Sequence, residues 1–78
     1  MYLAVKKVKP LNNFTLLLTF ESGEERSFDM KPFLDFGVFK ELKDEIKFKT
    51  VRISFDTIEW DNEIDFDPEL LYENSQPA

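Results

Sequence analysis

The segment FTLLLTF, residues 14–20, constrains the fold more than any other part of the chain. Every second residue is apolar, which is the period of a strand with one buried face: Phe14, Leu16, Leu18 and Phe20. Glu21, Ser22 and Gly23 follow, and Gly23 can take a positive φ at little cost. We therefore expect a hairpin whose second strand covers residues 24–30, with the turn glutamates Glu21, Glu24 and Glu25 solvated.

The chain before this hairpin predicts one more strand. Leu3 and Val5 share a face, but Val8 falls out of phase. Either a bulge near Lys6 and Lys7 resets the register, or the strand ends there. Pro10 lacks a backbone N–H, so we expect regular pairing to stop at that residue.

The middle of the chain predicts helical turns and then two strands. Pro32 suits the first turn of a short helix near 31–35, and a second helix near 38–44 follows a break at Gly37. One helical face should turn to the sheet, because its apolar residues have i, i+3, i+7 spacing: Phe39, Leu42 and Ile46. Residues 47–55 then predict a strand with one apolar face: Val51, Ile53 and Phe55. Ile58 and Trp60 continue its antiparallel partner, with Trp60 closing the core and its N–H near water.

The C-terminal segment carries a helix start signal. Asp67 is a typical N-cap, Pro68 suits the first helical position, and Glu69 favours the positive first turn. We expect residues 74–78 to fray. The whole order is three strands, a short helical segment, two strands and a terminal helical turn. It predicts one α+β domain over residues 1–78, a small antiparallel sheet with helices on one side.

Residue types argue against an enzyme. The 78 residues include no Cys and no His, which excludes thiolate zinc sites and a His-assisted nucleophile, and the two glycines stand alone. We expect no catalytic residue and no cofactor. An EF-hand loop beginning at Asp61 would need Gly at position 6 and Glu at position 12, where Phe66 and Tyr72 stand. The chain also lacks a signal peptide and an apolar run of about 18 residues, so we expect a cytoplasmic protein without membrane contact.

The charge points to a protein partner. The net charge is −6, and residues 56–78 hold eight acidic residues and no basic one. Such a surface repels phosphate, so direct nucleic-acid binding is not expected, whereas a basic protein would be attracted. The candidate partner-binding residues are Asp56, Glu59, Asp61, Glu63, Asp65 and Asp67. Alternation along the first strand places Lys7 and Lys9 on one face and Lys6 on the other, which favours a solvated strand edge.

The order of these motifs resembles that of the bacterial domain of unknown function 2442 family. The resemblance runs from about Val5 to Leu71 and includes FTLLLTF, ESGE, FDMKPFL, GVFKELKD, FKTVRIS and IEWDNEIDFDPELLY. Its most specific part is the arrangement of Trp60, Asn62, Asp65, Pro68 and Leu71. Members often have Gly in the turn where this chain has Glu63, so the family's turn type is not carried over to this chain.

The resemblance implies a small α+β domain with no established activity. Some relatives carry a helix-turn-helix segment, for which we expect no room in a chain of 78 residues, and others are encoded beside another small protein, as toxin–antitoxin pairs are. The leading hypothesis is an acidic, antitoxin-like partner of a small basic protein. An accessory subunit of a DNA-associated transcriptional regulator and a weak calcium- or magnesium-binding domain are the alternatives, and a homodimer through a sheet edge is a further hypothesis.

Overall fold

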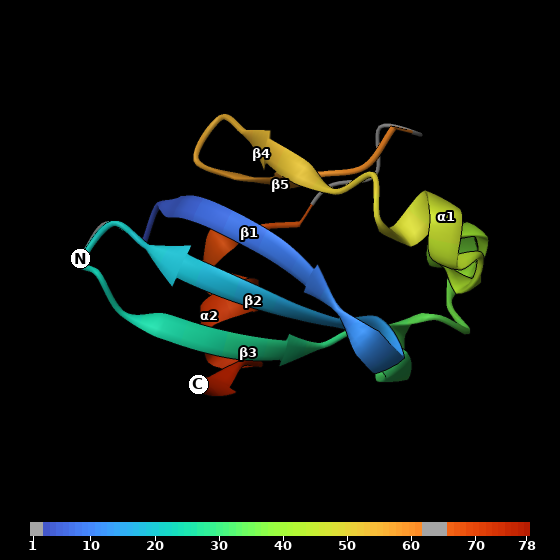
Figure 1. Cartoon of the computed structure of the whole chain (residues 1–78), viewed down its shortest axis with the longest axis horizontal. Coiled ribbons are helices and arrows are strands. Elements are labelled where there is room, and N and C mark those ends of the chain that lie inside the picture. Colours follow the sequence, from blue (N-terminus) through green and yellow to red (C-terminus); the bar gives the residue numbers. More distant parts are fainter. Residues whose placement is uncertain (1–2, 62–65) are drawn as a thin grey trace.

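A computed structural model describes residues 3–61 and 66–78, which form two antiparallel sheets. The larger sheet has the order β1-β2-β3-β6, and its strands are β1 (Val5–Leu11), β2 (Thr15–Phe20), β3 (Glu25–Asp29) and β6 (Gln76–Pro77). The smaller sheet is a hairpin of β4 (Arg52–Ser54) and β5 (Thr57–Glu59), and it stands beside β1 (Figure 1). The predicted α+β class is confirmed.

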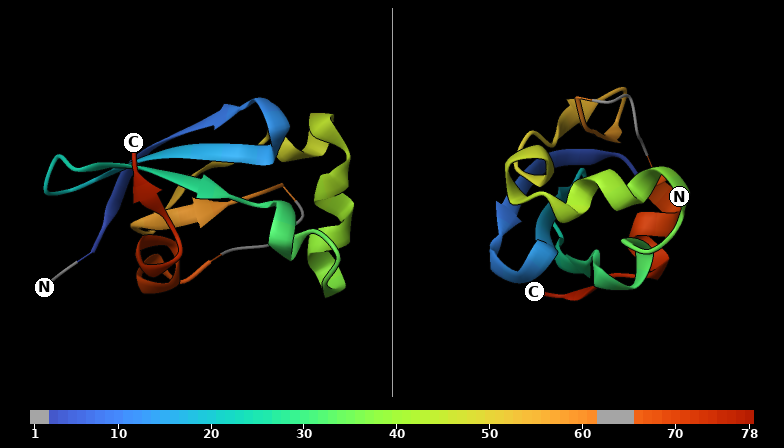
Figure 2. Two further views of the ribbon diagram at one scale, coloured as in Figure 1. Left: turned by 90° about the horizontal axis from the view of Figure 1, so that it is seen from below. Right: turned by 90° about the vertical axis from the view of Figure 1, so that its right-hand side faces the viewer.

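The helical segments are short. They comprise the 3₁₀ helices η1 (Asn12–Phe14), η2 (Lys31–Phe33) and η3 (Gly37–Lys43) and the α-helices α1 (Glu45–Phe48) and α2 (Pro68–Glu73). Figure 2 shows α2 against one face of the larger sheet, while η3 and α1 close one end of the molecule. Within the described ranges, no helix is long and apolar enough to cross a membrane.

The core lies between the larger sheet, α2 and the η2–α1 region. The inward face of β2 is as predicted, since Leu16, Leu18 and Phe20 are buried and alternate with half-buried residues. Leu16 stands opposite Phe28 of β3, so the two strands present one apolar surface. Gly23 has φ +91°, the positive value expected in the hairpin turn.

Strand β1 resolves one question and corrects one prediction. Its register shifts between Val5 and Lys7, so a bulge is present at the predicted place. Pro10, however, does not end the strand, because it pairs with Leu16 and β1 continues to Leu11. The reason is that β1 is the outermost strand of its sheet, where a missing backbone N–H is tolerated.

The middle of the chain differs from its prediction in two places. Ile46 does not face the sheet: its side chain is 78% exposed. The assumed α-helical spacing fails because η3 is a 3₁₀ helix of three residues per turn, and Asp44 is extended before α1 begins a new turn. The predicted strand over 47–55 is also too long. Its first two residues, Lys47 and Phe48, belong to α1. Phe55 lies in the β4–β5 turn and not on a strand face.

The C-terminal tail is paired instead of frayed. Gln76 and Pro77 stand opposite Ser27 and Arg26 of β3, and the backbone N–H of Ala78 donates to the carbonyl of Glu25 at 3.1 Å. The tail is paired because long-range contacts, which sequence spacing does not reveal, hold it against β3.

Arg26 supplies the contacts that hold the tail. Its Nε donates to Ser75 Oγ and its Nη2 to the Ser75 carbonyl, both at 2.7 Å, and its guanidinium lies 4.3 Å from the centre of the Tyr72 ring. Glu24 completes the group, although we expected it to be solvated: Oε2 accepts from Arg26 at 2.6 Å and Oε1 from the Tyr72 hydroxyl at 2.9 Å. The hydrogen bond from Arg26 lowers the pKa of Glu24, and the hydrogen bond to Glu24 raises the pKa of Tyr72.

These shifts predict a pH-dependent contribution to stability. Because the pKa of Glu24 is lowered on folding, its contribution is present above the ordinary value of 4.5 and is lost as the pH falls through the folded value. We expect Glu24→Gln to make the fall in unfolding free energy between neutral and acidic pH shallower. Urea unfolding across that range measures the slope, with Glu21→Gln in the same turn as the control. Equal slopes for wild type and Glu24→Gln would contradict the prediction.

Candidate functional site

The four predicted acidic residues that the structure describes do not all converge on one point. Asp56 lies in the β4–β5 turn, Glu59 ends β5, Asp61 follows Trp60, and Asp67 precedes α2. Glu63 and Asp65, together with the turn predicted at Asn62 and the apolar anchor predicted at Ile64, lie outside the described residues. The acidic residues that the structure does describe therefore form separate local contacts.

Two of these acidic residues hold the local fold. The backbone carbonyl of Asp56 accepts from the N–H of Val5 at 2.8 Å, and its carboxylate lies 3.6 Å from Lys6 Nζ. Asp67 is the N-cap of α2, as its sequence context predicts, and its Oδ1 accepts from the N–H of Glu69 at 2.9 Å. Both residues therefore serve the fold as well as adding negative charge.

Glu59 and Asp61 share a basic neighbour that sequence reasoning missed. Arg52 Nη1 lies 2.5 Å from Asp61 Oδ1, and Arg52 Nη2 lies 3.6 Å from Glu59 Oε1. Arg52 stands directly opposite Glu59 in the β4–β5 ladder, so strand register creates the contact. The acidic surface is thus partly neutralised at Glu59 and Asp61.

This arrangement offers no support for a metal site in the described part of the chain. Among residues 3–61 and 66–78, no group of three acidic side chains is placed to hold an ion. The carboxylate of Asp61 is engaged by the guanidinium of Arg52, which is itself a cation. Of the described carboxylates, those of Asp56 and Asp61 form ion pairs and that of Asp67 accepts a capping hydrogen bond.

Trp60 is part of the core, as predicted, but its indole N–H is not near water, contrary to our expectation. The side chain is fully buried, and Nε1–H donates to the backbone carbonyl of Phe48 at 2.9 Å instead of pointing to water. This bond joins the end of the β4–β5 hairpin to the end of α1. It fixes the position of one side chain that lines the hollow described next.

An apolar hollow of about 380 Å³ opens between α1 and the end of the hairpin. We call it the Ile46 hollow, and it is lined by Glu41, Leu42, Ile46, Lys47, Thr50, Trp60 and Asp61. Leu42 and Trp60 are buried, whereas Ile46 is largely exposed at the rim. Two charged residues of the lining form an ion pair, with Lys47 Nζ 3.8 Å from Glu41 Oε1. The result is an apolar depression whose lining also includes the carboxylates of Glu41 and Asp61.

The exposure of Ile46 has a signal in the sequence. Asp44 Oδ1 accepts from the N–H of Ile46 at 2.9 Å, so Asp44 is an N-cap and Glu45 occupies the first turn of α1. A cap at Asp44 restarts the helical phase, and apolar residues before and after it no longer share a face. Attention to this cap would have placed Ile46 on the surface.

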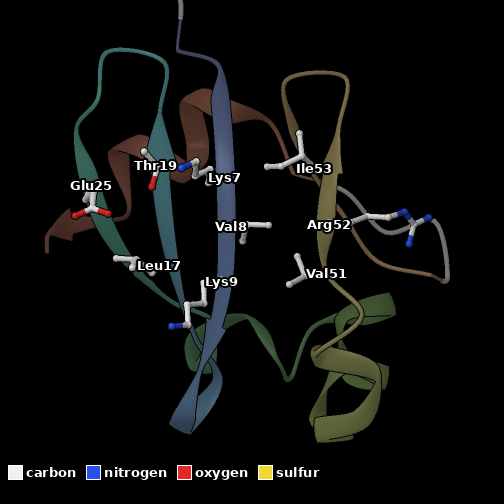
Figure 3. A pocket seen from close by; sticks show the side chains of 9 residues that line it. All are labelled: Lys7, Val8, Lys9, Leu17, Thr19, Glu25, Val51, Arg52 and Ile53. Carbon is white, nitrogen blue, oxygen red and sulfur yellow. The ribbon is translucent and has the colours of Figure 1, made fainter.

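A second, wider hollow of about 550 Å³ lies across β1 and β4 (Figure 3). Val8, Val51 and Ile53 meet on one side of β1, and Lys7 and Lys9 extend over β2 on the other. Lys7 and Lys9 therefore share a face, as alternation predicts. Lys7 and Lys9 are exposed to solvent, and the third cation of the lining, Arg52, pairs with Glu59 and Asp61. We therefore describe this hollow as a solvated surface between the two sheets.

The geometry of the site favours docking over chemistry. Among the described candidate residues, Asp56 contacts Lys6, Glu59 and Asp61 contact Arg52, and Asp67 caps α2. The Ile46 hollow is lined mainly by apolar atoms. An apolar depression with a polar border is the usual arrangement at the centre of a protein interface. The Ile46 hollow is therefore the candidate site.

Comparison with known proteins gives one match. The model of a family described as "Protein of unknown function (DUF2442)" matches residues 5–77, nearly the whole chain. No curated protein matches the chain. No solved structure matches it either.

The role of Asp67 as a cap predicts a cost to its removal. We expect Asp67→Ala to lower the free energy of unfolding by about 1 kcal/mol, because the N–H of Glu69 loses its acceptor. Glu73→Ala removes the same charge from the opposite end of α2, where a carboxylate is unfavourable, and should cost nothing measurable. Chemical denaturation measures both variants. Similar losses for the two would show that charge, and not capping, is responsible.

The different positions of Ile46 and Leu42 predict different effects of substitution. We expect Ile46→Ser to change the unfolding free energy by less than about 0.5 kcal/mol, since the side chain is mostly exposed. Leu42→Ala should cost about 2–5 kcal/mol, since it leaves a cavity in the core. Urea titration of both variants provides the test. A large loss for Ile46→Ser would place that residue in the core after all.

Proposed function

Since the chain belongs to the DUF2442 family, whose members have no described function, we propose that it is a non-enzymatic protein-interaction domain. The observation that supports this proposal is the Ile46 hollow, an apolar depression with an exposed isoleucine on its rim. Phe36 and Val38, which precede Ile46 in the sequence by ten and eight residues, are also apolar side chains exposed to solvent. A cytoplasmic location is part of the same proposal and is supported by the absence of cysteine.

The partner that we propose is a small basic protein. Eight acidic residues lie between residues 56 and 78, and the chain carries a net charge of −6. That net charge already includes the ten basic residues, among them Lys6 and Arg52, which pair with acidic residues of this segment. The remaining field attracts a cationic protein and speeds its association, while an apolar side chain of that protein fills the hollow and slows its release.

In its narrower form, the proposal makes this chain the antitoxin-like member of a pair. The acidic chain would cover a basic surface that the partner needs for its own activity. Expression of the neighbouring small protein alone should then slow growth, and co-expression with this chain should restore it. Growth curves in an inducible host measure the effect, and Ile46→Ser should restore growth less well than wild type.

The binding proposal is tested with the purified pair. We expect this chain and the small basic protein encoded beside it to co-purify at low salt and to separate as salt is raised. Calorimetry should show that Ile46→Ser weakens the complex about tenfold or more, as loss of a central apolar contact does. Asp61→Asn should mainly reduce the association rate and its dependence on salt.

Glu21→Gln is the matched control for Asp61→Asn. It removes the same charge from an exposed turn at the far end of β2, away from α1 (Figure 1). Absence of a complex at low salt would reject the proposed partner. Wild-type affinity for Ile46→Ser would reject the hollow as the binding surface even if a complex forms.

A further inference from the structure

The outer face of the larger sheet carries apolar side chains that the core does not use. Leu16 and Leu18 of β2 are buried on the inner face, where α2 also packs, so Leu17 between them points to the outer face. Figure 3 views this outer face, with α2 behind the sheet. A solvated sheet face normally carries polar residues. Leu17 and, beside β1, Ile53 depart from that pattern, since both are partly accessible to solvent and neither belongs to the core cluster.

These residues belong to the second hollow, of about 550 Å³, which we call the β1–β4 hollow. Its lining crosses from β3 over β2 and β1 to β4, and its apolar trough lies between β1 and β4, where Val8 meets Val51 and Ile53 (Figure 3). Strands in a sheet are about 4.8 Å apart, so β1 to β3 alone span roughly 10 Å. A lining spread over four strands fits a segment of polypeptide better than a small molecule, most of whose surface a pocket has to bury.

Two cations of this lining have no ion pair with any residue in the ranges 3–61 and 66–78. Lys7 and Lys9 are both exposed to solvent and form none, whereas the third cation, Arg52, is engaged by two carboxylates outside the lining. The lining itself contains the carboxylate of Glu25. Thr19 stands opposite both Lys7 and Glu25, so two strand spacings separate the backbones that carry these charges. The β1–β4 hollow therefore has a surplus of positive charge along β1.

The net charge of −6 does not remove this local surplus. Residues 1–20 include three lysines and no acidic residue. Glu69 and Glu73 belong to α2, which lies behind the sheet in Figure 3, and packed layers of a protein lie roughly 10 Å apart. Exposed charges that are farther apart than about 8 Å are largely screened at physiological ionic strength. The outer face therefore attracts anionic side chains even though the whole chain is acidic.

The two lysines have the spacing of an extended chain. They are two residues apart on β1, beyond its bulge, and both extend towards β2 (Figure 3). A strand rises about 3.3 Å per residue, so their backbones lie roughly 6.6 Å apart. Side chains of any extended segment alternate in direction with the same period. A segment that runs along β1 with alternating residue types therefore presents carboxylates to Lys7 and Lys9 and apolar side chains to the trough.

We propose that the β1–β4 hollow binds an extended segment of another protein in which acidic and apolar residues alternate. The carboxylates of that segment pair with Lys7 and Lys9, and its apolar side chains cover Val8, Val51 and Ile53. This inference goes beyond the proposed function, because the β1–β4 hollow shares no lining residue with the Ile46 hollow and selects a partner of opposite charge. The chain can then hold a basic protein and an acidic segment at the same time.

The test uses a synthetic octapeptide with blocked ends in which Glu and Val alternate. Its control has the same composition in the order Glu-Glu-Val-Val, repeated, so that no two carboxylates are two residues apart. Titration of ¹⁵N-labelled protein with each peptide to millimolar concentration measures binding from shifts of the backbone N–H signals. We expect shifts at β1 and at residues 51–53. The alternating peptide should bind about threefold or more tightly than its control, because it alone forms both ion pairs.

Charge reversal tests the role of the lysines. Lys9→Glu should lower the affinity for the alternating peptide about fivefold or more, since it replaces an attraction by a repulsion. Lys40→Glu is the matched control, because Lys40 is an exposed lysine of η3 that also forms no ion pair within the described ranges. Both variants change the net charge equally, so Lys40→Glu should stay within about twofold of wild type. Both should keep the melting temperature of wild type, since both side chains lie in solvent.

Three outcomes would overturn the proposal. The first is the absence of shifts at β1 with millimolar alternating peptide. The second is equal affinity for the two peptides, which would remove the argument from spacing. The third is an equal loss of affinity in Lys9→Glu and Lys40→Glu, because net charge alone would then explain the binding. Ile46→Ser should bind the alternating peptide as wild type does, and a loss there would show that the two hollows are not separate sites.

A nucleic-acid strand is the competing polyanion, and the same titration includes a strand of eight thymidines. The lining of the β1–β4 hollow contains no aromatic ring on which a base can stack, and the acidic chain as a whole repels a row of phosphates. The strand should therefore bind more weakly than the alternating peptide. Tighter binding of the strand would assign the hollow to nucleic acid and reject the proposed acidic segment.

Discussion

The packing of aromatic rings around Phe66 is the interaction on which the rest of this structure depends. The distance between ring centroids is 4.9 Å from Phe66 to Phe39, 5.5 Å to Phe28, 5.6 Å to Phe33 and 6.1 Å to Trp60. These rings come from η3, β3, η2 and the end of β5. Helical segments of three to seven residues do not hold their shape alone, so shared burial must hold them. In a chain of 78 residues, this cluster joins both sheets to the helical end of the molecule.

This cluster also determines what is left on the outside. Phe39, Leu42 and Phe48 turn inwards to reach the rings, and the capped restart at Asp44 leaves Ile46 on the opposite side. Ile58 and Trp60 anchor the hairpin in the same way, so Phe55 at its turn has no place in the core. The exposed apolar residues are therefore fixed in position by buried neighbours, and this is why they suit binding to a second surface.

The carboxylates of this acidic chain both stabilise local structure and supply its negative charge. Asp29, Asp44 and Asp67 each accept a hydrogen bond from the backbone N–H two residues ahead, and Asp44 and Asp67 thereby cap α1 and α2. Glu24 joins Arg26 and Tyr72, and Asp61 joins Arg52. Negative charge is thus distributed over many small structural roles, and it forms a long-range field without any single acidic cluster in the described part of the chain.

The sequence by itself determined the parts of the protein that depend on neighbouring residues. The alternation in β2, the positive φ at Gly23 and the cap at Asp67 all follow from contacts within a few positions. Only the tertiary structure decided what depends on distant residues. Pro10 is tolerated because β1 is the outermost strand, and the tail pairs because Arg26 reaches Ser75 across 49 residues. The Ile46 hollow exists because Trp60 packs beside α1. Local patterns specify backbone geometry, whereas the burial of side chains and their hydrogen-bond partners are decided only when separate segments of the chain pack together.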